Sequence, residues 1–310
     1  MSINPIKNEK ARAHIFMIFL VFCWGFDYVP AKWALELLSP SAVTFFKYAI
    51  GLVFVLILKL VSGNRNLVRK KDIPLFLLCA LVGQVMYFQC EYNAMSYLPV
   101  ALITIILSFV PAVSILAERV IFGRKANAKI YCGIVLCIVG IVLVIGADFG
   151  ILFQGRGIGY LLAMGAVISW NVYNFITAAL GEYDGLTLSV TQMLCSSLIL
   201  LPMAIPTMPS LTEFSGRIIF GLLWIGLIDS GIGYLIMVYG IKILGPTTAA
   251  IYSDFMPVTT AFFGVVILGE TITWLQIAGG IVVIVAGYIV IKEKGMLDEK
   301  QKQADSERKG

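Results

Sequence analysis

Long apolar runs that follow one another with only short breaks dominate this sequence. Ten of them have roughly the 20 residues that an α-helix needs to cross the hydrocarbon core of a bilayer. They lack the period-two alternation of barrel strands, so helices are predicted. Charged residues make up 13% of the chain, against about 25% in ordinary soluble domains. We therefore predict an all-α integral membrane protein. The expected transmembrane helices are 13–33, 40–61, 73–95, 99–121, 128–146, 157–179, 186–205, 216–241, 246–268 and 273–291.

The loop lysines and arginines give the expected topology. With the N-terminus in the cytoplasm, the basic groups 65–71, 119–129 and 292–309 all fall on the cytoplasmic side, as the positive-inside rule requires. The first apolar run follows a basic start, but no small-residue cleavage site follows it, so we expect an uncleaved span. The segments outside the spans are then a cytoplasmic N-terminus (1–12), an extracytoplasmic linker (147–156) and a cytoplasmic, disordered tail (292–310).

The sequence also repeats. A shift of 146 residues aligns Trp24 with Trp170, Pro111 with Pro257, Gly123 with Gly269 and Gly133 with Gly279. The matched residues occur in the same order over most of each half, which predicts two five-helix repeats, 13–146 and 157–291. Since five is odd, the second repeat must enter the membrane inverted. Two inverted repeats that rock about a midplane site are an architecture of secondary transporters.

Particular motifs strengthen this interpretation. They are "CWGFDYVPAKWAL", "YNAMSYLPVALITIILSFVPA", "YGIKILGPTTAAIYSDFMPVTTAFFGVVILGETIT" and "GGIVVIVAGYIVI". With them the chain resembles the EamA family of the drug/metabolite transporter superfamily over nearly its whole length. The resemblance implies a ten-helix carrier of small metabolites, commonly an exporter of amino acids or related compounds. The chain departs from the family pattern at "FGRK", where the second half has "LGET", and at Asp27 and Asp254.

Ionisable side chains inside a span cost about 2.5–3.5 kcal/mol each on insertion scales, so they tend to mark pathways or proton sites. The spans contain Asp27, Lys47, Glu91, Asp229 and Asp254. Asp27 and Lys47 share an expected depth of roughly 10 Å below the outer ends of the first two helices. Glu91 is expected nearer the outer end of the third helix, and Asp229 and Asp254 in the inner halves of the eighth and ninth.

Two roles remain open for these residues. Asp27 either pairs with Lys47 and fixes the packing of two helices, or it faces a central path and binds a substrate amine or a proton. The two roles overlap, because a pair can open when substrate arrives. Lys47 could also extend toward the interface along its aliphatic stem, and Glu91 could be an interfacial residue without a role.

Polar and aromatic stripes at helical spacing supply further candidates. They either join helices by hydrogen bonds or line the substrate path. The matched prolines kink their helices, as gating elements or as inherited shape. The candidates for substrate binding or proton coupling are Trp24, Gln84, Tyr87, Trp170, Asn171, Asn174, Tyr234 and Tyr252, and the gating candidates are Pro111 and Pro257.

The charges in the spans favour a cationic or zwitterionic, amino-acid-like solute, since four acids face one clear lysine. Phosphate esters would call for arginines or lysines instead. Because no Walker motif occurs, we expect no ATP-binding subunit, and transport by proton coupling or facilitated exchange. We expect export, with an uptake permease or multidrug efflux carrier of the same fold as alternatives, and a membrane enzyme or channel as remote ones. The single histidine and the cysteine spacing predict no metal site, and we expect no cofactor and no nucleic-acid partner.

Overall fold

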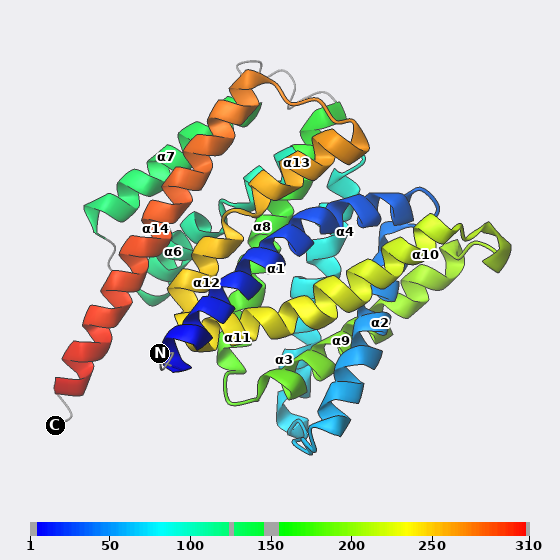
Figure 1. Cartoon of the computed structure of the whole chain (residues 1–310), viewed down its shortest axis with the longest axis horizontal. Helices are drawn as coiled ribbons and strands as arrows, with labels where there is room; N and C mark the ends of the chain where they lie inside the picture. The colour runs from blue at the N-terminus through cyan, green and yellow to red at the C-terminus, as the bar shows by residue number, and fades with distance from the viewer. Residues whose placement is uncertain (1–4, 124–126, 146–154, 308–310) are drawn as a thin grey trace.

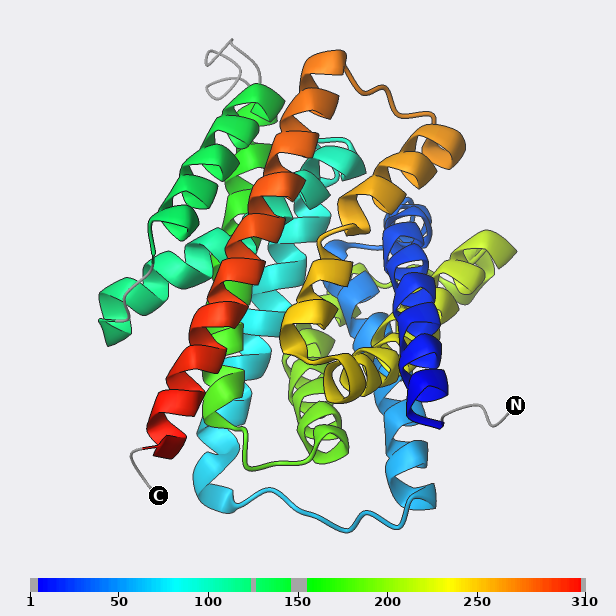
Figure 2. The same cartoon turned by 60° about the vertical axis from the view of Figure 1, so that its left-hand side comes forward.

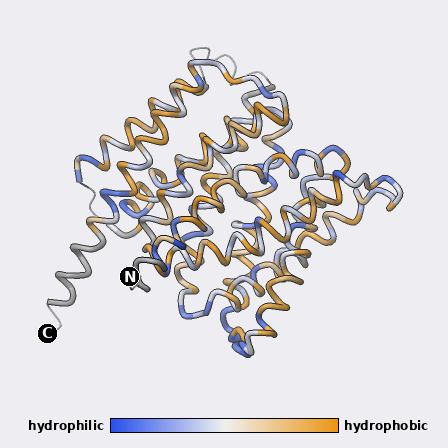
Figure 3. The backbone as a smooth tube through the Cα atoms, in the orientation of Figure 1, coloured by the Kyte–Doolittle hydropathy of each residue, from blue (hydrophilic) through white to orange (hydrophobic). Residues whose placement is uncertain are grey.

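The computed structural model describes residues 5–123, 127–145 and 155–307, and all regular structure within these ranges is helical. The helices form one bundle, with both chain ends at the same end of it (Figures 1 and 2). We name this the terminal end; the opposite end carries segment 269–273 (Figure 2). Hydrophobic residues line the helices, and hydrophilic ones collect in the loops and at helix ends (Figure 3).

The helices divide between two halves of the chain. The first half contains α1 (Pro5–Leu35), α2 (Pro40–Val61), α3 (Ile73–Ala80), α4 (Tyr87–Ala94), α5 (Val100–Leu107), α6 (Val110–Phe122) and α7 (Ala128–Ile145). The second half contains α8 (Gly155–Ala179), α9 (Gly185–Ala204), α10 (Gly216–Leu223), α11 (Tyr234–Leu244), α12 (Pro246–Ser253), α13 (Met256–Leu268) and α14 (Trp274–Glu307). The π-helical segments η2 (Leu81–Met86) and η6 (Trp224–Gly233) join α3 to α4 and α10 to α11.

The predicted all-α membrane fold is confirmed. Within the described residues, nine helical segments are long and apolar enough to cross a membrane, and a tenth, Ala128–Val144, is a shorter apolar helix. Four of these spans are not single regular helices. The third and eighth contain the π-helical segments, and the fourth and ninth are broken between α5 and α6 and between α12 and α13.

The structure repeats as the sequence does. Gly123 and Gly269, which a 146-residue shift aligns, both end a helix with the positive φ that glycine tolerates best, 65° and 66°. Pro111 and Pro257 both lie in the first turn after a helix break. The predicted kinks are thus present. Proline favours the first turn of a helix because it has no N–H to leave unpaired.

Helices that correspond under the 146-residue shift have corresponding packing partners. Helix α1 packs against α10, η6, α11 and α13, and its counterpart α8 packs against α3, η2, α4 and α6. Helices α2 and α9 pack against each other, as do α7 and α14. In each of these pairs, the two helices are counterparts under the shift. This pattern is expected of two halves related by a twofold axis.

Close backbone contact holds α7 against α14. A Cβ atom built on Gly279 would lie 2.7 Å from the carbonyl oxygen of Gly140, and one built on Gly140 would lie 2.9 Å from the carbonyl oxygen of Gly279. Both distances are too short for a side chain. Small residues are typical of tightly packed membrane helices, because lipid gives helices no hydrophobic reason to associate. These helices carry none of the predicted site residues.

One expectation differs from the structure. We expected a disordered tail from Lys292, whereas α14 continues as a helix to Glu307. Its sequence after the apolar part is rich in Lys, Glu and Gln and has no proline. These residues are good helix formers, so the apolar helix continues into the polar segment without a stop signal.

We predict that Gly279→Val will lower the thermal stability of the purified protein. The branched side chain would meet the backbone of Gly140, and overpacking of this kind costs about 1–3 kcal/mol. Ala278→Val is the matched control, because Ala278 is the exposed neighbour on the same helix. Melting curves in detergent compare the two. Equal melting temperatures would contradict the close packing of α7 and α14.

Candidate functional site

Lys47 lies at the centre of a buried group of charges. It belongs to α2 and is 3% exposed. Its ammonium Nζ is 2.6 Å from Asp229 Oδ2 on η6 and 3.6 Å from Asp27 Oδ2 on α1. The predicted pair of Asp27 and Lys47 is therefore present, but the closer partner of Lys47 is Asp229. We call Asp27, Lys47, Asp229 and Glu91 the central ion cluster.

Glu91 completes the central ion cluster on its α4 side. It is 3% exposed, so the interfacial alternative is wrong. Its Oε1 accepts hydrogen bonds from the hydroxyls of Tyr28, at 2.6 Å, and Tyr87, at 2.9 Å. Phe88 of α4 adds an aromatic ring 4.2 Å from Lys47 Nζ. A ring at that distance attracts an ammonium ion electrostatically.

The charges of the cluster do not balance. Three carboxylates face one ammonium, and Oδ1 of Asp27 is buried with no hydrogen-bond partner among the described residues. An unpaired carboxylate oxygen in a low-dielectric site is costly. The cluster can thus accept one further donor: a proton, or an ammonium group from another molecule.

Glycines bring the charged residues together. A Cβ on Gly226 would lie 2.6 Å from Ile50, and one on Gly51 would lie 3.2 Å from Ser230. Bare backbone at these two positions lets α2 approach the π-helical segment η6, so that Lys47 reaches Asp229. We expected Asp229 in the inner half of its helix. It instead lies midway along Gly216–Leu244, which is longer than the predicted span.

A second buried polar group contains Gln84. Its side-chain oxygen accepts a hydrogen bond from Ser196 of α9, and its amide lies 3.5 Å from Gln192. The hydroxyl of Tyr173 on α8 donates to the same Gln192 oxygen at 3.0 Å. These contacts join the third, sixth and seventh spans, as interhelical hydrogen bonds do.

The other predicted residues lie around these two groups or apart from them. The ring of Trp170 stands between those of Tyr87 and Tyr173, with centroids 5.0 and 4.9 Å away. Asn171 is buried and donates to the carbonyl of Val167. Asn174 is exposed, so it does not join them.

Three further predicted residues lie outside both groups. Trp24 is half-buried, and its Nε1 has no partner among the described residues. Tyr234 donates to the carbonyl of Gly185, and Tyr252 bonds to Nδ1 of His14 at 2.8 Å. The structure thus does not bring the aromatic candidates together at one site.

Sequence reasoning missed five contributors: Tyr28, Phe88, Tyr173, Gln192 and Ser196. Tyr28 follows Asp27 directly, and Phe88 lies three residues before Glu91 on the same helix. Adjacency to a charged residue was the available signal. Gln192 and Ser196 are spaced four residues apart, so they share one face of α9, and that spacing could have identified them.

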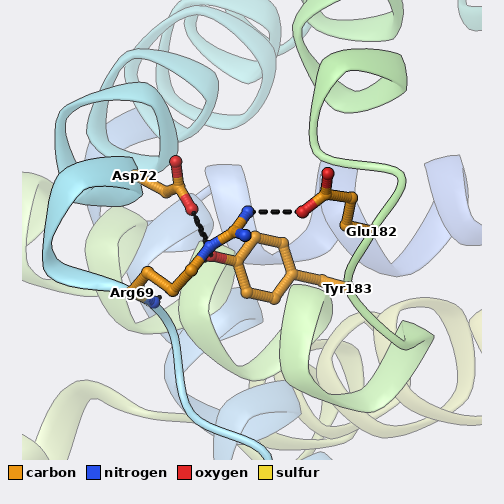
Figure 4. Close-up of polar contacts among 4 residues, drawn as sticks. All are labelled: Arg69, Asp72, Glu182 and Tyr183. Carbon is orange, nitrogen blue, oxygen red and sulfur yellow. Dashed lines mark hydrogen bonds and ion pairs between the residues drawn. The ribbon is translucent and has the colours of Figure 1, made fainter.

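At the terminal end, polar contacts join the second and third spans to the sixth and seventh. Arg69 contacts Glu182 at 2.6 Å and Asp72 at 2.8 Å, and the hydroxyl of Tyr183 donates to Asp72 (Figure 4). At Asp184, burial raises the pKa, but hydrogen bonds from Asn66, Thr187 and Asn64 outweigh it and hold the pKa well below its usual range. A related ion pair, Glu36 with Arg217, lies at the opposite end.

A separate contact closes the opposite end. Lys32 Nζ donates to Glu270 Oε1 at 2.8 Å, and the N–H of Val100, at the start of α5, donates to Glu270 Oε2 at 3.0 Å. The carboxylate thus joins α1, α5 and the segment after α13. A carboxylate at a helix N-terminus is favourable for the helix dipole.

The two repeats are not in equivalent conformations. All of Val100–Leu107, which is α5, is buried. In its counterpart α12, only Ala249 is buried within 248–253, and the rest are half-buried. Helix α5 also packs against α13, whereas α12 packs mainly against α11, α14 and α1. Helix α5 is therefore covered more completely by its neighbours than α12 is.

Comparison with known proteins agrees with this fold. The model of the EamA-like transporter family matches residues 11–146 and again residues 157–292. A solved crystal structure superposes with a TM-score of 0.64 at 17% identity, over 91% of this chain and 98% of the other, and shows the same fold.

Curated relatives cover most of the chain. An uncharacterized transporter, YvbV, from Bacillus subtilis is 24% identical over 92% of this chain and 93% of its own length. A probable amino-acid metabolite efflux pump from Salmonella typhimurium is 23% identical over 88% and 92%. A probable terminal-alkyne amino-acid exporter from Streptantibioticus cattleyicolor is 23% identical over 73% and 75%. With two matches to the family model that together span most of its length, this multi-pass membrane protein belongs to the EamA-like transporter family.

Proposed function

We propose that the protein exports a cationic or zwitterionic, amino-acid-like metabolite across the cytoplasmic membrane, with both chain ends in the cytoplasm. The observation that carries the proposal is the central ion cluster. It lies where the two repeats meet, and one fully buried oxygen of its three carboxylates, Asp27 Oδ1, has no hydrogen-bond partner among the described residues. A substrate ammonium group could donate a hydrogen bond to this oxygen, and Lys47 can pair with a substrate carboxylate.

The names of two relatives support an amino-acid-like solute, since they are described as a probable efflux pump and a probable exporter of such compounds. The positive-inside distribution of loop charges supports the topology. The family supports a carrier rather than an enzyme or channel. Uptake or multidrug efflux by the same fold is the alternative, and the direction of flux in oriented vesicles distinguishes them.

The unequal burial of α5 and α12 supports alternating access. In inverted-repeat carriers the two repeats exchange conformations when the protein switches between its inward-open and outward-open states. We propose that this structure is closed at the opposite end, around Glu270, and is closer to opening at the terminal end. The helix breaks at Pro111 and Pro257 would then be the places where the spans bend.

Transport by the purified protein in lipid vesicles tests the function. A melting-temperature screen with amino acids, polyamines and nucleobases first identifies a stabilising solute. Uptake of the labelled solute should then saturate and be stimulated by unlabelled solute on the far side, which a channel would not show. Failure of every ammonium-bearing solute to bind or to be transported would contradict the proposal.

We predict that Asp27→Asn will abolish or sharply slow transport without preventing insertion, since the amide removes the charge that attracts a substrate ammonium. Initial rates in vesicles measure the effect. Glu36→Gln, at the exposed end of the same helix, is the control and should keep normal rates. Normal rates in Asp27→Asn would leave this carboxylate with a packing role alone.

We predict that Lys47→Met will lower the melting temperature, because it leaves buried carboxylates without their cation. Removing one partner of a buried ion pair costs about 3–5 kcal/mol. The double variant with Lys47→Met and Asp229→Asn should lose less stability than the sum of the two single losses, since the carboxylate nearest to Lys47 is removed together with it. Additive losses in the double-mutant cycle would show that Asp229 is not the partner of Lys47.

We predict that Glu270→Gln will loosen the opposite end. The neutral amide loses the ion pair with Lys32 and weakens the bond to Val100 N–H, so α5 should exchange its amide hydrogens faster. Hydrogen–deuterium exchange of peptides that cover 100–107 measures this. Glu213→Gln, which alters a carboxylate in a surface turn, is the control. Unchanged exchange in Glu270→Gln would contradict the closing role.

A further inference from the structure

Asp254 lies apart from the central ion cluster. It follows the last residue of α12, at the break in the ninth span, and is 6% exposed. Its Oδ2 is fully buried and has no hydrogen-bond partner among the described residues. The ion pairs of those residues use other carboxylates. Asp254 is therefore a buried acid that nothing in the proposed substrate site accounts for.

Asp254 receives no hydrogen bond at its buried Oδ2 from the described residues. It stands at the C-terminal end of α12, where helix carbonyls carry partial negative charge. Pro257 has no N–H, so the carbonyl of Ser253 lacks the donor that a continuous helix would supply. An ionised Asp254 would keep a buried acceptor, Oδ2, that no described residue pairs with. A neutral carboxylic acid removes the charge and adds an O–H donor.

Helix α14 provides the space for this side chain. A Cβ built on Gly287 would lie 2.5 Å from Asp254 Oδ2, so the carboxylate rests against bare backbone. In the first repeat the corresponding residues are Ser108 and Ile141, as the 146-residue shift shows. The second repeat thus has an acid and a glycine where the first has a hydroxyl and a bulky side chain. The exchange of both residues indicates a built site rather than an isolated substitution.

The elements packed against α12 carry several titratable groups. Helix α12 packs against α1, α11 and α14. From α1, His14 bonds to Tyr252 two residues before Asp254. The thiol of Cys137 on α7 also faces Asp254 and belongs to an apolar cluster with Val283 and Ala286. The other titratable groups include Tyr239 and Lys242 on α11 and Tyr288 on α14, and among the described contacts none of these three bonds to the Asp254 carboxylate.

We propose that Asp254 is a proton-binding site, separate from the substrate site, and that it holds a proton in this conformation. Binding is a single proton transfer: hydronium at the terminal end gives its proton to a carboxylate oxygen and leaves as water. The apolar neighbours favour a proton over a sodium ion, which needs several oxygen ligands at once. Coupling of this proton to transport rests on the proposed function, whereas the protonation itself does not.

Carbodiimide labelling tests the protonation without any transport. Dicyclohexylcarbodiimide enters apolar regions and reacts with protonated carboxyl groups. We expect wild-type protein in detergent to gain one label on the peptide that contains residue 254, at a rate that falls as the pH rises. Asp254→Asn should lose this label, and Asp27→Asn should keep it. Absence of the label at every pH in folded wild type, or labelling blocked by sodium chloride and unaffected by pH, would overturn the proposal.

Proton flux in vesicles tests the coupling. Asp254→Asn carries a neutral side chain of similar shape and should still show the melting-temperature increase with the stabilising solute. It should lose solute-driven proton movement, measured with a pH-sensitive dye. Asp254→Ser, which copies the residue of the first repeat, is a second variant in case the first does not fold. Solute-driven proton flux at the wild-type rate in either folded variant would overturn the coupling role.

Discussion

The cost of burying charge in a membrane governs the centre of this protein. Lys47 and its acidic neighbours lie within the membrane-spanning part of the bundle, so each charge must be paired with an opposite charge, hydrogen-bonded or neutralised. Lys47 meets this condition through Asp229, Asp27 and the ring of Phe88. Glu91 meets it through two tyrosine hydroxyls. The fully buried Asp27 Oδ1, which has no hydrogen-bond partner among the described residues, is what makes the cluster a binding site in our account rather than a closed salt bridge.

The inverted repeat supplies the scaffold, and departures from it supply the chemistry. Under the 146-residue shift, Asp27 corresponds to Tyr173 and Lys47 to Met193. Asp229 corresponds to Gly83, whose bare backbone the ring of Tyr173 covers. Asp27 and Asp229 thus form part of a charged cluster, whereas their counterparts pack the ring of Tyr173 on the backbone of Gly83. Asp254 and Ser108 differ in the same way. At each of these four pairs of positions, only one of the two repeats carries a charged side chain.

The sequence predicted the scaffold well, because span length, loop charge and repeated prolines and glycines are local signals. It also predicted the pair of Asp27 and Lys47, which lie at one depth on consecutive helices. It did not place Asp229 with them, since the approach of α2 at Gly226 depends on three-dimensional packing. Nor did it separate Asn174, which is exposed, from Asn171, which is buried. One turn of a helix distinguishes these two, and only the neighbouring helices decide which of them faces inward.

The central claim is that the cluster of Asp27, Lys47 and Asp229 binds a substrate through its ammonium group. Calorimetric titration of the purified protein with a stabilising solute, and with the same solute lacking its amino group, tests this most directly. Our account predicts heat of binding for the ammonium compound alone, and its loss in Asp27→Asn. Equal binding of the deaminated compound, or unchanged binding in Asp27→Asn, would contradict it.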